Sequence, residues 1–359
     1  MTDTLVLGHE RLRAFIVAVL DRWGAPPAIA ATTAELMVRT DLRGVDSHGI
    51  GMLPKYHEWY RAGYIVPAAE PEVVRDAGPT ATLDGRQGFG HHVARIAMEL
   101  AIGKARAHGV GFVAVRNSNH YGAAANYSMM ALAHDMIGVS MTNSPWPATV
   151  PTFGRRPMLG TNPLSVAAPA GREAPFVLDM ATSTVAIGKL HVASRWARPI
   201  PAGWALDPAG RPTTDPDLAL ASRLLTPLGG TPEQGSHKGY GLSVMVDILA
   251  GVLAGAAHSD VQRRRPAAPA RADVGHFFGA VDVARFRPLA EFRADMDDLL
   301  RSLKDSPKAE GADRIWVAGE PEWECEARRR REGIPLAPGL VRQLRALAAA
   351  VGVPFPPAG

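Results

Sequence analysis

The sequence DLRGVDSHGIGMLPKY, residues 41–56, joins two expected helices and has the tripeptide Ser-His-Gly at its centre. Upstream of it, apolar residues recur at helical spacing over residues 12–23 and again over residues 29–41. Downstream, residues 50–61 form the next expected helix, which places His48 near a helix N-terminus. The partial positive charge at that end disfavours imidazolium and lowers the pKa of His48. A histidine so placed is a candidate proton donor, because its ordinary pKa lies near neutrality.

Four further polar clusters follow this stretch, each directly after a strand-like apolar run. They are NSNHYG at residues 117–122, GTNPLS at residues 160–165, LDMATS at residues 178–183 and HKGYG at residues 237–241. Apolar periodicity predicts strands at residues 80–84, 110–115, 136–141, 164–168, 176–180 and 276–281. It predicts helices at residues 91–108, 123–134, 183–193, 239–254, 291–304 and 340–351. This mixture of strands and helices indicates an α/β fold.

Residues 110–141 have the strand, helix, strand order of a βαβ-like unit. The polar loop at residues 117–122 follows the first strand, at the carboxyl end where open α/β sheets bind ligands. The dinucleotide fingerprint GxGxxG is missing, because neither Gly88 nor Gly109 begins a pattern with all three glycines in register. The sequence therefore predicts an α/β fold that is not a Rossmann fold.

Length and composition describe an ordinary globular chain of 359 residues, with 47% hydrophobic and 21% charged residues. A chain of this length exceeds one usual core, so two domains or one large domain are expected. The net charge is +4. The arginine runs at residues 263–265 and 328–331 are interpreted as solvated faces or loop ends, because no aromatic platform accompanies them. A nucleic-acid partner is therefore not predicted.

Targeting and redox features favour the cytoplasm. The N-terminus lacks the charged-then-apolar order of a signal peptide. No apolar run approaches the roughly 18 residues that a membrane span needs. Cys325 is the single cysteine and cannot form an internal disulfide, which fits a reducing compartment. We expect a cytoplasmic protein without a membrane partner, in which residues 199–216 and 256–275 form irregular segments.

Two hydrolytic interpretations of the histidines are weaker. Ser47 beside His48 suggests a serine hydrolase, but adjacent residues of an extended chain point to opposite sides and no GxSxG elbow is present. A bond from the Ser47 hydroxyl to the imidazole is therefore expected to be awkward. Metal hydrolysis of the HExxH type needs a second histidine four residues after His9 or His57, and neither has one. No metal site is predicted.

Taken together, the Ser-His-Gly stretch and the four clusters resemble the malate/L-lactate dehydrogenase family, whose members do not use a Rossmann fold. Relatives include sulfolactate and ureidoglycolate dehydrogenases and diketogulonate reductase. The resemblance implies an NAD(P)-binding α/β domain with a mixed sheet at residues 76–287. It also implies a helical domain at residues 1–75 that residues 288–359 complete. A homodimeric oxidoreductase with a small 2-hydroxy or 2-oxo acid as substrate is expected.

Three residues are candidates for proton transfer. The resemblance maps the family's proton relay onto Ser47, His48 and Asp179, with His48 as the general acid and base. Asp179 also ends the apolar run FVLDM, where a carboxylate is expected to be hydrogen-bonded. It could steady the imidazolium of His48, as the carboxylate of a catalytic triad does, or it could cap the helix that begins near Thr182.

The resemblance places the cofactor, NAD or NADP, against residues from several segments. These are His48, His120, Tyr121, Gly122, Leu178, Asp179, Met180, Ala181, Thr182, His237, Lys238, Ala318, Gly319 and Glu320. Lys238 precedes a helix and could meet a phosphate there, and Gly122 lets backbone approach a ligand closely. Ala318 stands where the family usually has proline. The sequence does not decide between NAD and NADP.

Two departures from the family's pattern concern the substrate. Met52 stands where several members carry an arginine that could clamp a carboxylate bidentately, and Ile187 replaces another arginine, so a second substrate carboxylate is less well provided for. The pattern is closer to the hydroxycarboxylate dehydrogenase branch, where aromatic or simple 2-oxo acids are accepted. Possible substrate contacts are Arg43, Lys55, Thr161 and Asn162, although the last two could equally form a turn. A cyclic imine reductase of the same family and a non-catalytic binding protein are the alternatives.

Overall fold

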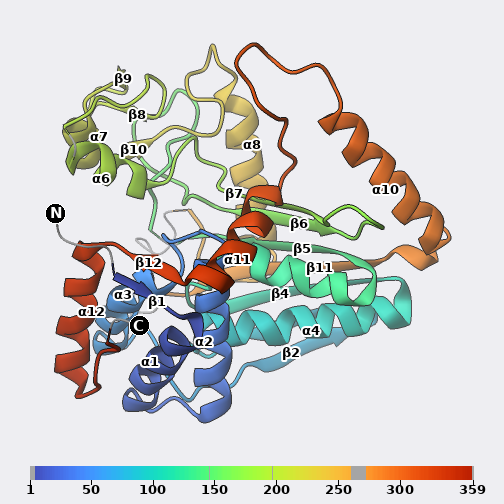
Figure 1. Cartoon of the computed structure of the whole chain (residues 1–359), viewed down its shortest axis with the longest axis horizontal. Coiled ribbons are helices and arrows are strands. Elements are labelled where there is room, and N and C mark those ends of the chain that lie inside the picture. The colour runs from blue at the N-terminus through green and yellow to red at the C-terminus, as the bar shows by residue number, and fades with distance from the viewer. Residues whose placement is uncertain (1–4, 145, 196, 260–271, 358–359) are drawn as a thin grey trace.

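The computed structural model describes residues 5–144, 146–195, 197–259 and 272–357. Its centre is a seven-stranded mixed sheet (Figure 1). The strand order is β2 (Glu72–Ala77), β3 (Thr80–Asp84), β4 (Val110–Ser118), β11 (Val274–Asp282), β5 (Met136–Thr142), β6 (Leu164–Ala168) and β7 (Phe176–Met180). Only β3 and β4 pair in parallel, and the other neighbours are antiparallel. The predicted α/β fold with a mixed, non-Rossmann sheet is confirmed.

Strand β11 corrects the predicted βαβ-like unit, because it lies between β4 and β5 and pairs with both. Its side chains alternate between the two faces of the sheet, as in any strand. Phe278 packs with the buried face of α4 (Gly90–His108), whereas Phe277 packs on the other face with Ala250 and its neighbours. The sheet is therefore covered on both faces, and only a segment from far along the chain completes its centre.

The helix expected at residues 123–134 is split in the structure into α5 (Ala125–Ser128) and a 3-10 segment, η2 (Met129–His134). The helix expected at residues 239–254 is α8 (Ser236–Val246), followed by a π-helical segment, η3 (Asp247–Val252). Residues 199–216, expected to be irregular, contribute β8 (Ala205–Leu206) and β9 (Pro212–Thr213) to a small sheet with β10 (Leu224–Leu225). Helices α6 (Ile187–Arg195) and α7 (Pro216–Ser222) accompany this sheet.

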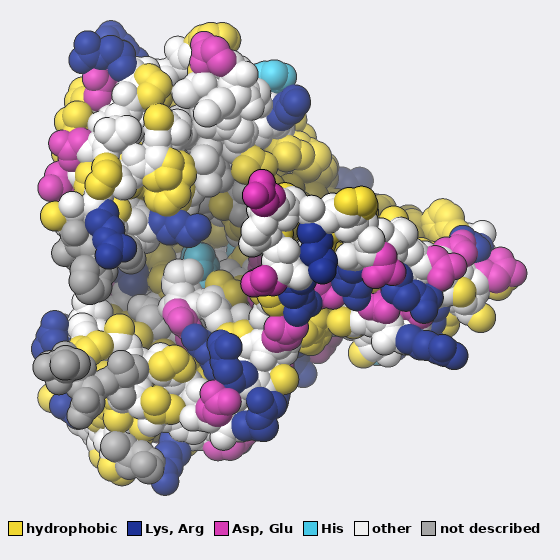
Figure 2. All heavy atoms as spheres, turned by 45° about the horizontal axis from the view of Figure 1, so that its top comes forward, with side chains coloured by type: hydrophobic (Ala, Val, Ile, Leu, Met, Phe, Trp, Pro, Cys, Tyr) yellow, Lys and Arg dark blue, Asp and Glu magenta, His cyan; other side chains and the backbone are white. Residues whose placement is uncertain are grey.

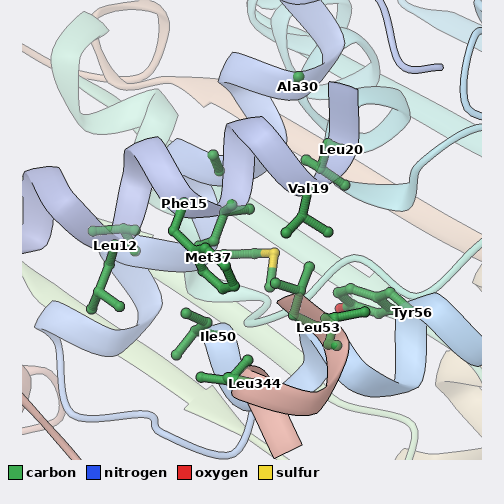
Figure 3. Close-up of a cluster of buried hydrophobic side chains, with 14 of the residues drawn as sticks. Leu12, Phe15, Val19, Leu20, Ala30, Met37, Ile50, Leu53, Tyr56 and Leu344 are labelled. Carbon is green, nitrogen blue, oxygen red and sulfur yellow. The ribbon is translucent and has the colours of Figure 1, made fainter. Parts of the chain in front are cut away.

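The two ends of the chain form a helical layer together. Helices α1 (His9–Arg22), α2 (Pro27–Leu42), η1 (Ile50–Met52), α3 (Leu53–Arg61) and α12 (Pro338–Val351) share one apolar core. Met37 and Ile50 from the N-terminal part meet Leu344 from α12 in this core (Figure 3). Strand β1 (Leu5–Leu7) also pairs with β12 (Ile334–Leu336).

The arginine run at residues 328–331 has surroundings that differ from those expected. That run belongs to α11 (Glu320–Glu332), a helix that the apolar pattern did not predict. Arg329 is buried there, so the interpretation of the whole run as a solvated face is wrong. Helix α10 (Leu289–Lys304) follows η4 (Val283–Arg285) and lies at the edge of the molecule (Figure 1). The run at residues 263–265 lies outside the described residues, as does most of the loop at residues 256–275.

A hollow separates two masses of the molecule in the space-filling view, and a histidine side chain is visible inside it (Figure 2). In Figure 1, the helical layer of α1, α2, α3 and α12 lies at the lower left, beside the central sheet. Within the described ranges, the helices are too short or too polar to cross a membrane.

Candidate active site

The loop that carries Ser47 and His48 lies between α2 and η1, and we call residues 43–49 the His48 loop. The carboxylate of Asp41, in the last turn of α2, accepts a hydrogen bond from the Ile50 N–H at 2.7 Å. A Cβ atom on Gly49 would lie 2.0 Å from an oxygen of Asp41, so only glycine fits against this carboxylate. Burial raises the pKa of Asp41 to about 8. Close packing against Asp41 thus explains why a glycine follows His48.

The Ser47 hydroxyl lies 2.8 Å from Nδ1 of His48. The bond expected to be awkward is formed, because the loop is turned and not extended. The His48 N–H donates to the Val45 carbonyl oxygen at 2.9 Å and closes that turn. Ser47 therefore contacts Nδ1, which leaves Nε2 as the ring nitrogen that can meet a ligand.

His48 and His120 form a stacked pair, with ring centroids 5.4 Å apart and an interplanar angle of 26°. Burial lowers the pKa of His48. The pKa of His120 is held well below its usual range, first by burial and then by the neighbouring imidazoles of His48 and His91. Both rings are nevertheless partly open to solvent, as expected for groups that line a concave surface. Near pH 7 the pair is neutral, so each ring presents one N–H and one bare nitrogen.

The tautomer of His120 follows from its partners. The Tyr56 hydroxyl lies 2.7 Å from Nδ1 of His120, and the Gly122 N–H donates to the same nitrogen at 3.3 Å. Burial raises the pKa of Tyr56, so its hydroxyl keeps the proton that it donates. Two donors at Nδ1 require that this nitrogen be bare. Neutral His120 therefore carries its proton on Nε2 and can donate it to a ligand atom.

His91 lies behind this pair and was not among the predicted site residues. Its ring is fully buried, and neither ring nitrogen has a hydrogen-bond partner among the described residues. The ring of Tyr56 meets it edge-on at 5.6 Å. Gly122 has a positive φ of 75°, and a Cβ atom there would lie 2.8 Å from Nε2 of His91. Burial lowers the pKa of His91 to about 3, so it stays neutral.

Asp179 ends β7 and accepts a hydrogen bond from the Ala125 N–H, at the start of α5, at 2.7 Å. Across the residues described, no hydrogen bond joins Asp179 to His48, so the expected contact is replaced by a cap on α5. The expected helix near Thr182 begins later, at Ile187. The carboxylate is reached by solvent, yet protein surrounds it, and burial raises its pKa to about 6 against the opposing effect of the Ala125 N–H.

Two residues expected at the cofactor lie in the core instead. Tyr121 is fully buried, stacks on His276 at 4.7 Å and places its hydroxyl 3.1 Å from that of Ser140. Thr182 is also fully buried, and its hydroxyl donates to the Thr161 carbonyl oxygen at 3.1 Å. The side chains of these two residues therefore face the protein. Of the other residues expected at the cofactor, Leu178, Met180 and Ala181 are partly exposed.

His237 and Lys238 lie side by side in the first turn of α8, and both side chains are exposed. The residue before the helix, Gly235, has φ of 92° and no side chain to cap the first N–H groups. An uncapped helix N-terminus beside a lysine suits an anion such as a phosphate. The structure thus gives these two predicted residues surroundings that fit a dinucleotide.

The Ala318–Glu320 motif lies against β7. The Ala318 carbonyl oxygen accepts from the Val177 N–H at 3.0 Å, and Gly319, with φ of 97°, fits closely over Val177. The Glu320 carboxylate is already engaged, because Lys304 lies 3.2 Å from it and Arg314 3.3 Å. This motif and the start of β7 are therefore neighbours.

Three of the predicted substrate contacts have partners inside the protein. Arg43 is buried, forms an ion pair with Glu326 at 3.3 Å and lies 4.0 Å over the ring of Trp323. Lys55 is exposed and pairs with Glu58 on α3. Asn162 is fully buried with φ of 38°; its side chain accepts from the Ser144 N–H and donates to the Ser243 carbonyl oxygen. The turn interpretation fits Asn162 and, through its carbonyl bonds to Thr182, also Thr161.

Three aromatic side chains beside the histidine pair were not among the site residues predicted from the sequence. They are Tyr56, Trp59 and Trp146, and we call them the aromatic wall. The ring of Trp59 lies 6.2 Å from that of His120, and Trp146 stacks on Trp59 at 4.9 Å with an angle of 9°. Tyr56 and Trp59 are three residues apart on α3, a spacing that puts both on one helix face and could have been noticed. Trp146 comes from the loop after β5, which sequence spacing does not reveal.

Comparisons with known proteins agree with this architecture. The family model described as malate/L-lactate dehydrogenase matches residues 7–345. The chain is 42% identical over 345 residues to a malate dehydrogenase of Pyrococcus abyssi, covering 96% of this chain and 94% of that one. It is 39% identical to an L-sulfolactate dehydrogenase of Methanocaldococcus jannaschii, with 97% and 98% covered.

A solved structure shows the same fold. The malate dehydrogenase of Entamoeba histolytica superposes with a TM-score of 0.93 at 35% identity, covering 99% of this chain and all of that one. The family model spans most of the chain, and the relatives match over nearly their whole length. The chain therefore belongs to the malate/L-lactate dehydrogenase family.

Proposed function

We propose that this protein is a nicotinamide-dependent oxidoreductase that interconverts 2-hydroxy and 2-oxo carboxylic acids. The observation that carries the proposal is the neutral, partly solvent-accessible imidazole pair of His48 and His120, within a chain of this family. Ser47 contacts one ring and Tyr56 the other, so both rings are oriented by hydroxyl groups. Such a pair suits proton transfer to and from a substrate oxygen.

The residues that would hold NAD or NADP fit such a group. His237 and Lys238, at the uncapped start of α8, would meet the phosphates. The partly exposed segment from Leu178 to Ala181 and the adjoining Ala318–Glu320 motif would flank the rest of the dinucleotide. When bound, the nicotinamide supplies or accepts the hydride. The choice between NAD and NADP stays open.

Proton transfer falls to the chain's own side chains. In oxidation of a 2-hydroxy acid, a bare Nε2 of His48 would accept the hydroxyl proton while Nδ1–H donates to Ser47. In reduction the same nitrogen would return the proton to the carbonyl oxygen. His120, with its proton on Nε2, would donate a hydrogen bond to that oxygen and stabilise the charge that develops there. For Asp179 we propose an indirect role, since it holds the start of α5.

The substrate class follows from the wall beside the histidines. Tyr56, Trp59 and Trp146 carry no positive charge, and Arg43 is already paired with Glu326. A second carboxylate would find no cation on this wall, whereas an apolar or aromatic substituent would bury surface against its two accessible members, Trp59 and Trp146. We therefore propose monocarboxylic 2-oxo acids with apolar side chains, in preference to the dicarboxylate of the relatives named malate dehydrogenase.

Coenzyme oxidation with a substrate panel tests the proposal. Purified protein with NADH or NADPH would be given phenylpyruvate, pyruvate, oxaloacetate and piperideine-2-carboxylate, and coenzyme absorbance would be followed. We expect turnover of 2-oxo acids with the highest kcat/KM for phenylpyruvate. A preference for oxaloacetate would refute the substrate class alone, and turnover of the cyclic imine alone would favour the imine reductase. Coenzyme binding without turnover of any compound would favour the binding protein.

Substitution of His48 tests its role. His48→Ala removes the proton donor, and general acid catalysis is worth about 10² to 10⁴ in rate. We expect kcat to fall by that factor, while the Kd for NADH from a fluorescence titration changes little. His134→Ala, an exposed histidine that contacts Arg106, is the control and should keep full activity. A kcat within threefold of the unsubstituted enzyme would remove His48 from the proposal.

The homodimer, the cytoplasmic location and the division into domains at residues 75 and 287 stay predictions. Light scattering at micromolar concentration measures the first. A strict monomer there would contradict it.

A further inference from the structure

A buried arginine of α11, Arg329, is bound both to Asp41, in the last turn of α2, and to Asp46 within the His48 loop. The Arg329 guanidinium donates to the Asp41 carbonyl oxygen at 2.5 Å. It also grips the Asp46 carboxylate with both terminal nitrogens, one of them at 3.1 Å. Asp41 precedes the loop, and Asp46 directly precedes Ser47. Arg329 is only 8% exposed, and its two-pronged contact with a carboxylate is a charge-assisted pair of hydrogen bonds.

The two aspartates pass this anchoring to the histidine. Asp41 binds the Ile50 N–H and packs against Gly49, the residue after His48. Asp46 belongs to the turn that places the Ser47 hydroxyl on the His48 ring. Arg329 thus contacts two residues that precede the Ser47–His48 pair, and one of them, Asp41, holds the Ile50 N–H that follows the pair. A group in this position can set the direction of the imidazole but cannot take part in proton transfer.

Helix α11 is fixed at its other end to β7. The Ala318 carbonyl oxygen binds the Val177 N–H at 3.0 Å, and the Trp323 indole N–H donates to the Pro175 carbonyl oxygen at 3.2 Å. Glu326, midway along the helix, holds Arg43 of the His48 loop at 3.3 Å. A helix of 13 residues is about 20 Å long and stiff. It therefore spans from the start of β7, the strand that contains Asp179, to the loop that carries His48.

We propose that Arg329 is a positioning residue for His48, and that α11 acts as a strut that fixes the His48 loop relative to the start of β7. The proposal rests on the proposed function in that His48 transfers the proton. Arginine is required, since its planar fork binds both oxygens of Asp46 and the Asp41 carbonyl oxygen together. The compact ammonium of a lysine can satisfy only part of this set.

The experiment compares Arg329→Met, Arg329→Lys and Asp46→Asn with the unsubstituted enzyme. Arg331→Ala is the matched control, because Arg331 lies on the same helix with its side chain 70% exposed. Hydrogen–deuterium exchange of the segment at residues 43–52 reports on the anchor directly, since the Ile50 N–H is one of its hydrogen bonds. Steady-state kinetics with the best 2-oxo acid of the panel report on the consequence.

For Arg329→Met we expect exchange at residues 43–52 to accelerate about tenfold or more and kcat to fall about 10- to 100-fold. The KM for NADH should change less than twofold, because the α8 end of the site is untouched. Millimolar guanidinium should restore part of kcat, and Arg329→Lys should be intermediate. The double variant with Asp46→Asn should be no worse than Arg329→Met alone, since both remove the same contact.

Each outcome separates the anchor from the reaction. Unchanged exchange in Arg329→Met refutes the anchor, whatever the enzyme acts on. Faster exchange with unchanged kcat refutes the positioning role. Faster exchange in a protein that turns over no 2-oxo acid refutes the proposed function and leaves the anchor standing. Should Arg329→Met fail to fold, Asp46→Asn gives the same readouts. The Asp46 side chain is 55% exposed, so asparagine fits there, and Arg329 is the one buried charge that loses its ionic partner.

Discussion

Gly122 is the residue at which backbone geometry and the histidine cluster meet. Its φ of 75° is costly for other residues, and a Cβ atom would crowd Nε2 of His91 at 2.8 Å. We expect Gly122→Ala to lower the free energy of unfolding by about 1–3 kcal/mol and to reduce kcat by displacing His120. Urea denaturation measures the first and kinetics the second.

The control for this change is Gly103→Ala. Gly103 lies inside α4 with open space where a Cβ atom would be. Alanine there should raise the free energy of unfolding by about 0.4–1 kcal/mol. If Gly122→Ala were equally stabilising, the crowding against His91 would be disproved.

Asp41 gives the protein a stability that depends on pH. Its pKa is raised to about 8 by burial, against 3.8 in the unfolded chain, with Asp46 adding to the rise and Arg329 and the Ile50 N–H opposing it. Between these values the folded state holds a proton that the unfolded state has released. The free energy of unfolding therefore falls as pH rises from about 4 to about 8 through this group.

Asp41→Asn imitates the protonated form and should remove that slope. The stability of the variant relative to the unsubstituted protein should increase steadily from pH 5 to pH 8, measured by urea titration at each pH. Asp21→Asn changes an exposed carboxylate on α1 and should leave the slope unaltered. A parallel pH profile for Asp41→Asn would show that Asp41 is ionised in the folded state throughout.

Among the elements, α8 carries the predicted contact with the cofactor that is easiest to test. Its N-terminus has no side-chain cap and exposes Lys238. A charge-assisted hydrogen bond is worth about 1.5–3 kcal/mol, so Lys238→Ala should weaken NADH binding roughly 10- to 100-fold by fluorescence titration. Lys238→Arg should keep most of the affinity, and Arg22→Ala, on α1, all of it. Equal affinity of all three variants would place the phosphates elsewhere.

The elements that the apolar pattern found are those with buried apolar residues. Helices α1, α4 and α12 and strands β4, β5 and β11 were placed to within a few residues, because their apolar positions recur at the spacing of the element. Strand β2 is exposed along its whole length and gave no such signal. Helix α11 was missed for a similar reason, since Arg329 is its only fully buried residue and holds its place by charge.

The site was predictable where its residues are neighbours in the chain. His48 and Ser47 do lie together, and the motif at Ala318 does adjoin β7. The bond from Asp179 to Ala125 depends on how α5 sits against β7, which no local pattern fixes. The burial of Tyr121 likewise depends on β11, a strand from the far end of the chain, whose His276 stacks on the tyrosine ring.

At the scale of the molecule, the chain closes on itself through the core shared by α1, α2, α3 and α12. Leu344 of α12 is fully buried there among residues of the first quarter of the chain (Figure 3). Leu344→Ala should therefore cost about 2–5 kcal/mol, seen as a lower urea midpoint. Leu303→Ala, on the exposed side of α10 at 48% exposure, should stay within about 0.5 kcal/mol. A small effect at Leu344 would mean that the C-terminal helix is not part of the folding unit.

The stacked pair of Trp59 and Trp146 also has an optical consequence. Indole emission overlaps the absorption of a reduced nicotinamide, so Trp59 and Trp146 would pass excitation energy to a coenzyme bound beside His120. Binding of the coenzyme could then be followed through tryptophan fluorescence, and Trp146→Phe would weaken that signal.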